Sequence, residues 1–245
     1  MITLSVITIC YNDAAHLERT LRSVAEQKKS YPAIEYIVVD GASTDDTPAI
    51  LQRHAGEIDR LISEPDSGVY DAMNKGLRAA TGDYLCFLNS GDAFHAPGQI
   101  GEIFSPLASA GALPGVIYGQ TNLVDEAGAF LRLRAPKAPK NLSYQSFLRG
   151  MCVCHQSFYA RRDLAEEYDD RFRLSGDFDW CLAILHRSSY NLCTGRVLTD
   201  YLSEGLTTRN RLPSLKERLR IMIERYGLLP ALFAHLCFLL RLPFK

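Results

Sequence analysis

Polar and acidic side chains follow several apolar stretches of this sequence, at the positions where strands of a sheet would end. The clearest case is the apolar run 84–88, which is followed directly by Asn89, Ser90, Gly91 and Asp92. A carboxylate at such a strand end, beside a glycine, can hold a divalent cation against the phosphates of a nucleotide. A polar turn that caps a strand explains this one segment equally well.

Three further polar clusters follow apolar runs in the N-terminal half. They are residues 11–13, Asp40, and Glu64 with Asp66. In a parallel sheet built from βαβ units, right-handed crossovers bring the carboxyl ends of the strands to one edge. Four polar clusters at one edge favour a nucleotide site over four unrelated turns.

The elements that must position these clusters follow from the apolar pattern. The strands predicted for the N-terminal half are 2–9, 34–39, 61–62 and 84–88, and the helices are 14–27, 47–54 and 69–80. Strands that alternate with helices at these lengths indicate βαβ units. The sequence therefore predicts an α/β fold, with a mostly parallel sheet flanked by helices.

The second half of the chain is less regular. Its predicted strands are 116–119 and 129–134, on either side of a turn at 125–128, and its predicted helices are 142–148, 162–168 and 178–186.

Charge and cysteine content limit the class of protein. The formal net charge is -1, from 27 basic and 28 acidic residues, so we expect no nucleic-acid partner, for which a basic surplus is typical. The seven cysteines are scattered and odd in number, which argues against a disulfide framework and favours a reducing cytosol. Met1 leads directly into the first predicted strand, so we expect no signal peptide.

The segment 215–245 differs in composition from the rest. Lys216, Arg218, Arg220 and Arg225 lie on one predicted helix, and residues 228–240 are almost wholly apolar. This apolar run is too short to span a bilayer. A basic helix followed by an apolar one fits a peripheral segment in the membrane interface, and it fits equally a helix packed on the domain or in a dimer.

Five motifs occur in an order that resembles the family 2 glycosyltransferases, which have the GT-A nucleotide-sugar fold. The motifs are SVITICYN (5–12), IVVDGASTD (37–45), NKG (74–76), TGDYLCFLNSGD (81–92) and SGDFDW (175–180). The stretch 64–76 is similar to members that build bacterial exopolysaccharide and colanic-acid-type repeat units.

The resemblance covers about residues 3–210 and implies a domain organisation. We expect a GT-A domain over 1–210, with a nucleotide-sugar-binding half (1–98) and an acceptor half (99–210). A basic and apolar helical tail (211–245) follows it.

For the sugar donor, a UDP- or GDP-sugar, the resemblance assigns several residues. Tyr11 would lie against the nucleotide base, where an aromatic face provides stacking area. Asp40 would accept a hydrogen bond from the base edge, although a turn or cap residue is its alternative role. Asp66 and Lys75 would belong to the donor pocket.

The turn after the fourth strand would complete the donor site. By the resemblance, Asp92 binds Mg²⁺ or Mn²⁺, and Asn89 and Gly91 contact the donor. The family pattern usually has two acidic residues here, and Gly91 stands where the first would be. The carboxylate that would contact the ribose is therefore missing from this turn. One carboxylate can suffice, because Mg²⁺ often keeps waters and takes its other ligands from substrate phosphates.

On the acceptor side, the resemblance makes Asp177 the general base. A positioned carboxylate can take the proton of an acceptor hydroxyl as that hydroxyl attacks the anomeric carbon. Asp179 is the alternative base, and a helix N-cap is the alternative role of Asp177. Trp180 would support the acceptor pocket, and His155 matches a position near the acceptor.

The resemblance thus implies an inverting glycosyltransferase that uses a nucleotide-diphosphate sugar. Its expected acceptor is a lipid-linked oligosaccharide at the inner face of a bacterial membrane, in surface polysaccharide synthesis. Gly91 keeps open a different class of protein, a catalytically degraded subunit that binds sugar nucleotides. A sugar nucleotidyltransferase would need a glycine-rich loop after the first strand, and residues 9–13 contain no glycine.

Overall fold

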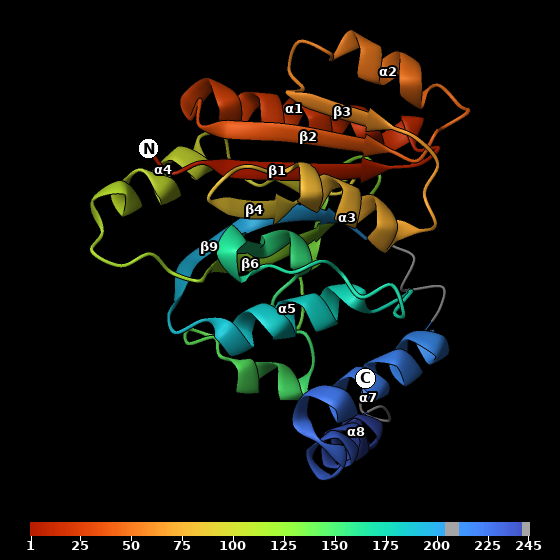
Figure 1. Ribbon diagram of the computed structural model, residues 1–245, viewed down its shortest axis with the longest axis vertical. Helices are drawn as coiled ribbons and strands as arrows, with labels where there is room; N and C mark the ends of the chain where they lie inside the picture. Colours follow the sequence, from red (N-terminus) through yellow and green to blue (C-terminus); the bar gives the residue numbers. More distant parts are fainter. Residues whose placement is uncertain (204–210, 242–245) are drawn as a thin grey trace.

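The structure, a computed structural model, describes residues 1–203 and 211–241. One mixed sheet runs through the molecule, with its strands in the order β3-β2-β1-β4-β8-β6-β9-β5 and with β7 paired to β6 (Figure 1). The expected domain boundary at 210 and the last residues of the expected tail lie outside the described residues.

The N-terminal half alternates strands with helices, as the sequence predicts. Its strands are β1 (Leu4–Cys10), β2 (Ile34–Asp40), β3 (Arg60–Ser63) and β4 (Tyr84–Phe87), and its helices are α1 (Ala14–Ser30), α2 (Thr47–Arg53) and α3 (Val69–Ala79). All three strand pairings within this half are parallel.

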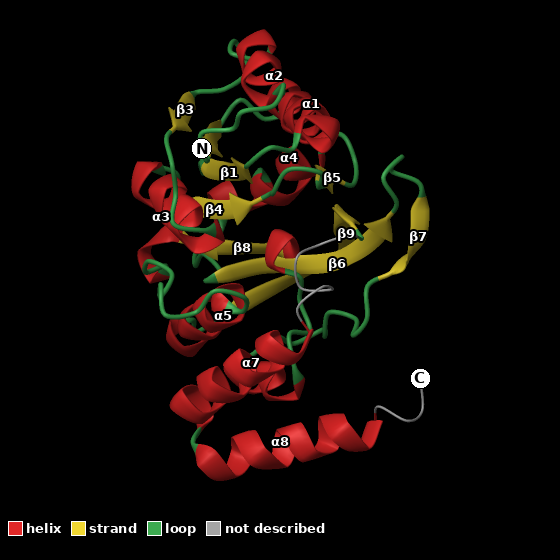
Figure 2. Cartoon of the chain, turned by 90° about the vertical axis from the view of Figure 1, so that its right-hand side faces the viewer, coloured by secondary structure: helices red, strands yellow, loops and turns green. Residues whose placement is uncertain are grey.

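Alternation along β1 places its side chains in two hydrophobic cores, one on each face of the sheet. Ile7 belongs to the core that includes Met73 of α3, and Val6 belongs to the core that includes Leu17 of α1. Every residue of β1 is buried, because helices cover both faces at this point (Figure 2). The rigid centre of the sheet therefore carries the loops that follow β1, β2 and β4.

The second half adds shorter strands of mixed direction. In chain order its elements are β5 (Ala93–Phe94), α4 (Gln99–Phe104), β6 (Val116–Val124), β7 (Phe130–Leu133), β8 (Phe158–Arg161), α5 (Gly176–Arg187) and β9 (Asn191–Leu202), with 3-10 turns at Pro106–Ser109, Tyr144–Arg149, His155–Ser157 and Arg162–Leu164. β8 is antiparallel to both β4 and β6, whereas β9 is parallel to β6.

Two of the helices predicted for this half differ in the structure. The segment 142–148 forms a 3-10 helix (Tyr144–Arg149) instead of an α-helix. The prediction for 162–168 is wrong beyond its first turn. The side-chain amide of Asn74 binds both the backbone N–H and the carbonyl of Tyr168, at 2.7 and 3.0 Å, so these groups are not available to a helix. The helix predicted at 178–186 is confirmed as α5.

Two helices are described after residue 210. They are α7 (Arg211–Tyr226) and α8 (Leu228–Arg241), and α7 packs against α5 (Figure 1). Among the described residues, every helix is too short or too polar to cross a membrane.

Each residue of the motif 74–76 on α3 makes a different structural contact. Asn74 fixes Tyr168, as described above. Lys75 donates to the carbonyl of Pro65 at 2.6 Å and pairs with Glu64 at 3.1 Å, which holds the loop before α3. Gly76 lies against β1, where a Cβ atom would be 2.4 Å from Cγ2 of Ile7.

Candidate functional site

The loops after β1 and β2 are tied to each other by hydrogen bonds between side chains and backbone. Asn12 Oδ1 accepts from the Thr44 backbone N–H at 2.8 Å, and the Asn12 N–H donates to Ser43 Oγ at 2.8 Å. Asp45 Oδ2 accepts from the Ala14 N–H at 3.1 Å, so α1 is capped by the neighbouring loop. Asp13, the N-cap residue of α1, makes no capping bond with its side chain.

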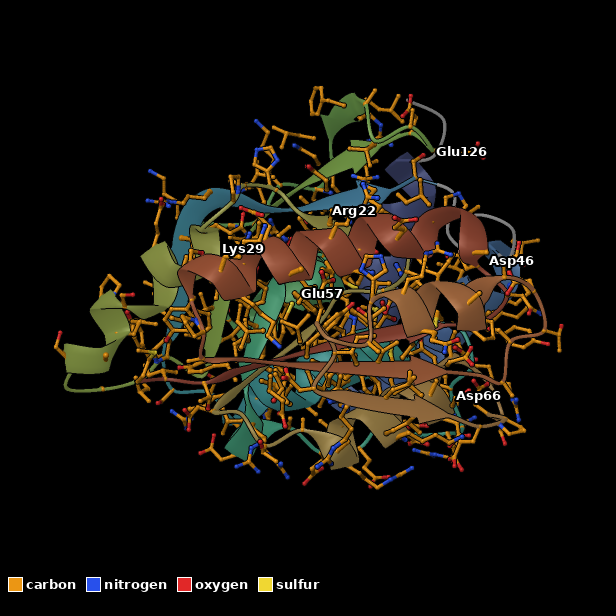
Figure 3. All side chains as sticks on the ribbon, turned by 90° about the horizontal axis from the view of Figure 1, so that it is seen from above. Arg22, Lys29, Asp46, Glu57, Asp66 and Glu126 are labelled. Carbon is orange, nitrogen blue, oxygen red and sulfur yellow. The ribbon has the colours of Figure 1, made fainter. Side chains whose placement is uncertain are left out.

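An aromatic ring and a carboxylate meet above Gly41, the residue that follows β2. A Cβ atom on Gly41 would lie 2.5 Å from Asp66 Oδ2 and 3.1 Å from the Tyr11 ring. Tyr11 is 63% exposed, so one face of its ring is available for stacking. Figure 3 shows Asp66 and Asp46 at the edge toward which β2 points. Lys29, near the C-terminal end of α1, lies on the opposite side of the molecule. The structure thus brings Tyr11 and Asp66 together, as the resemblance implies.

The carboxylate of Asp40 is buried at the end of β2. It accepts hydrogen bonds from the Ser43 N–H at 3.1 Å, from the Ser43 hydroxyl at 2.5 Å and from Ser63 Oγ at 2.7 Å. A carboxylate has about four acceptor positions, so these three donors occupy most of them. Ala42, two residues on, has a φ of 60°, a conformation that costs a non-glycine residue roughly 1 kcal/mol or more.

Lys75 is engaged by the loop before α3. Its side chain is only 12% exposed, and its ammonium group is bound by Pro65 and Glu64. Lys75 therefore orders the loop that carries Asp66, whose Oδ1 accepts from the Gly68 N–H at 2.9 Å.

The turn 89–92 is held from α1 by Thr20, a fully buried residue that the sequence did not single out. The Thr20 hydroxyl donates to the carbonyl of Asp92 at 2.7 Å and accepts from the Gly91 N–H at 3.0 Å. Asp92 is 3% exposed, and its Oδ1 accepts from the Leu202 N–H at the end of β9 at 2.9 Å.

Burial raises the pKa of Asp92 to about 8, against hydrogen bonds from Leu202 and Gln156 and the charge of Arg19, which lower it. The charge of Asp13 adds to the increase in pKa. A bound cation would favour the ionised carboxylate and so reverse this shift.

Gly91 has no room for the side chain that the family pattern usually carries there. Its φ is 90°, and a Cβ atom would lie 2.7 Å from Cδ2 of Leu202 and 3.4 Å from Cβ of His16. A side chain at position 91 would require the Leu202 side chain to move, and the positive φ favours glycine there.

The oxygen atoms of this turn fit a hard divalent cation. Besides the Asp92 carboxylate, Asn89 Oδ1 and Ser90 Oγ are buried and have no hydrogen-bond partner among the described residues. Oxygen ligands are those that Mg²⁺ and Mn²⁺ prefer. The described residues contain no group of three His, Cys, Asp or Glu side chains that could hold a metal, so a cation here would need further ligands from substrate and water.

Asp177 lies in the first turn of α5, whose N-cap is Ser175. The Tyr70 hydroxyl donates to Asp177 Oδ1 at 3.3 Å, and the Phe178 backbone N–H donates to the same oxygen at 2.9 Å. Gly176 allows this approach, since a Cβ atom there would be 3.0 Å from the Tyr70 ring. The carboxylate is half-buried, with its second oxygen outside these bonds.

Asp179, the alternative base, is engaged elsewhere. It forms a two-point ion pair with Arg225 of α7, with Nε to Oδ1 at 2.7 Å and Nη2 to Oδ2 at 2.8 Å. A buried carboxylate in such a pair has a structural role, which leaves Asp177 as the better placed of the two for proton transfer.

His155 and Trp180 both lie in a buried aromatic cluster behind Asp177. The His155 ring stacks on Phe87 at 5.1 Å between centroids, and its Nε2 bonds the Tyr168 hydroxyl at 2.8 Å. The Trp180 indole stacks on Tyr168 at 5.1 Å and donates to the Glu166 carbonyl at 2.9 Å. Both side chains are 3% exposed, so they support the site from within the core.

Tyr201 and Cys154 both lie within electrostatic range of Asp92 and Asp177. Burial raises the pKa of the Tyr201 hydroxyl, and the charges of Asp92 and Asp177 both raise it further. The same two charges raise the pKa of the Cys154 thiol. Asp92 and Asp177, which are 85 positions apart in sequence, thus both affect Tyr201 and Cys154. No local pattern marks Tyr201, because a strand was not predicted over 191–202.

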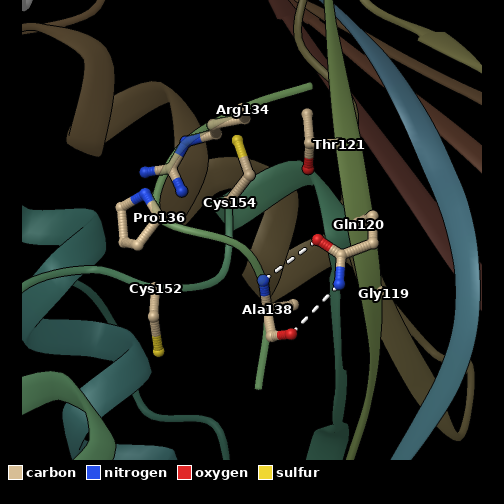
Figure 4. Close-up of a pocket in the computed structure, with 8 residues that line it drawn as sticks. All are labelled: Gly119, Gln120, Thr121, Arg134, Pro136, Ala138, Cys152 and Cys154. Atoms are coloured by element: carbon tan, nitrogen blue, oxygen red, sulfur yellow. Dashed lines mark hydrogen bonds between the residues drawn. The ribbon is translucent and has the colours of Figure 1, made fainter. Parts of the chain in front are cut away.

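A cationic side chain approaches this region from the loop after β7. Arg134 lowers the pKa of Tyr201 and of Cys154, and both terminal nitrogens of its guanidinium donate to the Met151 carbonyl at 3.1 Å. Figure 4 shows Arg134 beside Cys154, and the two hydrogen bonds through which Gln120 of β6 holds Ala138 of the loop, both at 3.0 Å. The loop after β7 is therefore tied both to β6 and to Met151.

A family model describes most of the chain that forms these loops. Residues 5–169 match the model of glycosyl transferase family 2. The chain belongs to this family. The match covers both the loops around Tyr11 and Asp40 and the turn that contains Asp92.

Curated relatives agree with this assignment. An uncharacterized glycosyltransferase of Mycobacterium tuberculosis is 36% identical over 185 residues, which is 74% of this chain and 68% of that protein. The amylovoran biosynthesis glycosyltransferase AmsB of Erwinia amylovora is 30% identical over 193 residues, 74% of this chain and 63% of that protein. The chain thus spans about two thirds of the length of these relatives.

Solved structures confirm the GT-A fold. Residues 1–349 of S. aureus TarS, in complex with UDP-GlcNAc, superpose with a TM-score of 0.70 at 15% identity, over 91% of this chain and 66% of that one. The mannosyltransferase PcManGT of Pyrobaculum calidifontis, in complex with GDP-Man and Mn²⁺, gives a TM-score of 0.68 at 17% identity, over 96% and 70%.

The buried imidazole of His155 makes stability depend on pH. Burial lowers the pKa of His155 to about 4 from an ordinary value of 6.5, while the charge of Asp177 opposes the shift. The unfolded chain therefore binds a proton between these two values that the folded chain does not. We expect the free energy of unfolding to be fully retained above pH 6.5 and to fall by on the order of 3 kcal/mol as the pH drops to 4.

Urea unfolding at several pH values measures this effect. His155→Gln keeps a polar group beside Tyr168 but does not titrate, so its stability should lose this part of the pH dependence. A variant with the same dependence as the wild type would show that His155 is not the group responsible.

Proposed function

We propose that this protein is an inverting glycosyltransferase that depends on Mg²⁺ or Mn²⁺. It moves a sugar from a UDP- or GDP-sugar to a hydroxyl of a lipid-linked saccharide, at the inner face of a bacterial membrane. The family assignment supports the reaction class. The TarS complex with UDP-GlcNAc and the PcManGT complex with GDP-Man and Mn²⁺ support the donor class and the cation.

One observation carries the proposal: the buried carboxylate of Asp92 shares a turn with Asn89 Oδ1 and Ser90 Oγ, two buried oxygens that have no hydrogen-bond partner among the described residues. A transferase of this kind needs one carboxylate beside the diphosphate and another beside the acceptor, with the reacting sugar between them. Asp92 follows β4 at the edge where Tyr11 and Asp66 also lie, and Asp177 begins α5 on the acceptor side.

The chemistry then runs as a single displacement. The acceptor oxygen attacks the anomeric carbon while Asp177 takes the hydroxyl proton. The bond from that carbon to the diphosphate oxygen breaks on the opposite face, and the nucleoside diphosphate leaves with the bonding electrons. Attack and departure on opposite faces invert the configuration of the sugar.

The residues of the chain supply binding and orientation for this step. Tyr11 stacks on the base, Asp40 binds the base edge, and Asp66 closes the donor pocket. A divalent cation bound at Asp92 supplies charge that offsets the negative charge on the leaving diphosphate. Tyr70 keeps Asp177 oriented through its hydroxyl, 3.3 Å from Oδ1.

The C-terminal helices support a membrane-bound acceptor. Exposed apolar side chains lie along α8, namely Leu228, Leu229, Leu232, Phe233 and Leu236. Residues 211–245 contain seven basic and two acidic residues, a net charge of +5 in a chain whose total is -1. Symmetric pairing of two such tails would bring like charges together, whereas an anionic lipid surface complements them. The name of AmsB, an amylovoran biosynthesis enzyme, supports a polysaccharide pathway.

The closed space at Gly91 favours one second candidate, a subunit that binds sugar nucleotides without transferring the sugar. Metal-dependent hydrolysis of the donor by the purified protein, without any acceptor, distinguishes the two. Hydrolysis supports the transferase, and donor binding without hydrolysis or transfer supports the binding subunit.

Replacing the proposed base separates chemistry from binding. Asp177→Asn should lower kcat by about 10²- to 10⁴-fold, because the acceptor proton loses its carrier. Donor affinity, measured by thermal stabilisation, should stay nearly unchanged. Asp179→Asn is the matched control, and it should lower thermal stability by weakening the pair with Arg225 while costing less activity. Equal losses of donor affinity and turnover in Asp177→Asn would contradict the assignment.

The apolar face of α8 can be tested with lipid vesicles. The wild-type protein should sediment with vesicles that contain anionic phospholipid, and added salt should weaken the binding. Leu229→Gln combined with Phe233→Gln should lower the vesicle affinity by roughly tenfold or more, since each side chain contributes about 1.5–3 kcal/mol when buried. Leu61→Gln on β3, an equally conservative change at an exposed leucine, is the control. A protein that dimerises through α8 and ignores vesicles would contradict the proposal.

A further inference from the structure

A single carboxylate on α7 binds the backbone just before α5. Glu217 Oε1 accepts from the Arg173 N–H at 2.8 Å, and Glu217 Oε2 accepts from the N–H groups of Leu174 and Ser175, both at 2.8 Å. Hydrogen bonds to a charged group are roughly twice as strong as bonds between neutral groups. Three of them on consecutive residues fix the direction of this short segment.

The segment that Glu217 binds leads directly into Asp177. Ser175 is the N-cap of α5, and its carbonyl accepts from the N–H groups of Phe178 and Asp179, at 3.1 and 3.3 Å. Its hydroxyl also bonds the Ser214 hydroxyl at 3.0 Å, and both serines are buried. Because Ser175 begins the helix, its position sets where the Asp177 carboxylate points.

A second anchor from the same helix lies just beyond Asp177. Arg225 binds both oxygens of Asp179, as described above. Arg218 adds a cation–π contact to the Phe178 ring at 5.8 Å. Asp177 thus lies between two attachments to α7, with Tyr70 of α3 on its other side.

We propose that α7 is part of the catalytic centre, and that Glu217 is a positioning residue for the general base. Glu217 touches neither donor nor acceptor and acts only by holding Arg173 to Ser175, and through them the first turn of α5. This inference rests on the proposed function, in which Asp177 takes the acceptor proton. It assigns to the C-terminal helices a role in turnover that is separate from any contact with lipid.

Glu217→Gln tests the inference, because glutamine keeps the size of the side chain but offers one acceptor oxygen and no charge. We expect kcat to fall by about 10- to 100-fold, since a displacement of the base by about 1 Å can cost that much. Donor affinity, measured by thermal stabilisation with the UDP- or GDP-sugar that the wild type hydrolyses or transfers, should change by less than about twofold. Glu224→Gln is the matched control on the same helix. Among the described residues its carboxylate pairs with Arg220 and Arg171 near the surface, so kcat should stay at the wild-type value.

A double-mutant cycle identifies the route of the effect. If Glu217 acts through Asp177, Glu217→Gln should cost little or nothing further in the Asp177→Asn protein. An undiminished loss in that background, or an equal loss of donor affinity and kcat in the single variant, would overturn the inference and leave Glu217 a purely structural residue.

A second variant, Ser214→Ala, and the comparison of Asp177→Asn with Glu217→Gln complete the test. Should Glu217→Gln fail to fold, Ser214→Ala decides, because it removes only the bond to the Ser175 hydroxyl and should lower kcat more than donor affinity. An unchanged kcat in Ser214→Ala would then contradict the inference. If Asp177→Asn itself keeps the wild-type rate, Asp177 is not the general base and the proposed mechanism is wrong. If Asp177→Asn is inactive and Glu217→Gln is fully active, only the role of α7 fails.

Discussion

The carboxylate of Asp92, buried at the end of β4, is the group around which the rest of the site is arranged. Burial alone would keep it protonated near neutral pH, and its pKa of about 8 reflects that cost. The chain offsets part of the cost with a backbone N–H from Leu202, and it fixes the turn through Thr20 of α1. A divalent cation and a diphosphate would complete the compensation, which explains why so polar a turn follows so apolar a strand.

The site depends equally on contacts between distant parts of the chain. β9 delivers Leu202 to Asp92, and Tyr201 lies within electrostatic range of both Asp92 and Asp177. α3 reaches Asp177 through Tyr70, and α7 holds the residues before it through Glu217. Because α7 leads through Gly227 into α8, the same helix pair that supports Asp177, the proposed base, also carries the exposed apolar face.

Local patterns in the sequence predicted the N-terminal half of the fold well, because each of β1, β2 and β4 is apolar along its own length. They failed where pairing decides the structure. β9 contains Gly195 and several polar residues, and its burial comes from its long pairing with β6. The helix expected at 162–168 is prevented by Asn74, 94 residues before Tyr168. The motifs pointed to Asp92 and Asp177, but nothing local marks Thr20 or Glu217 as their supports.

A crystal structure with a nucleoside diphosphate and Mn²⁺, with the manganese located by anomalous scattering, tests this account most directly. The account predicts a manganese peak bonded to an Asp92 oxygen and to the diphosphate. It also predicts that the Asp177 carboxylate faces the space just beyond the terminal phosphate. A manganese ion held by other residues, or an Asp177 carboxylate turned away from the phosphate, would contradict it.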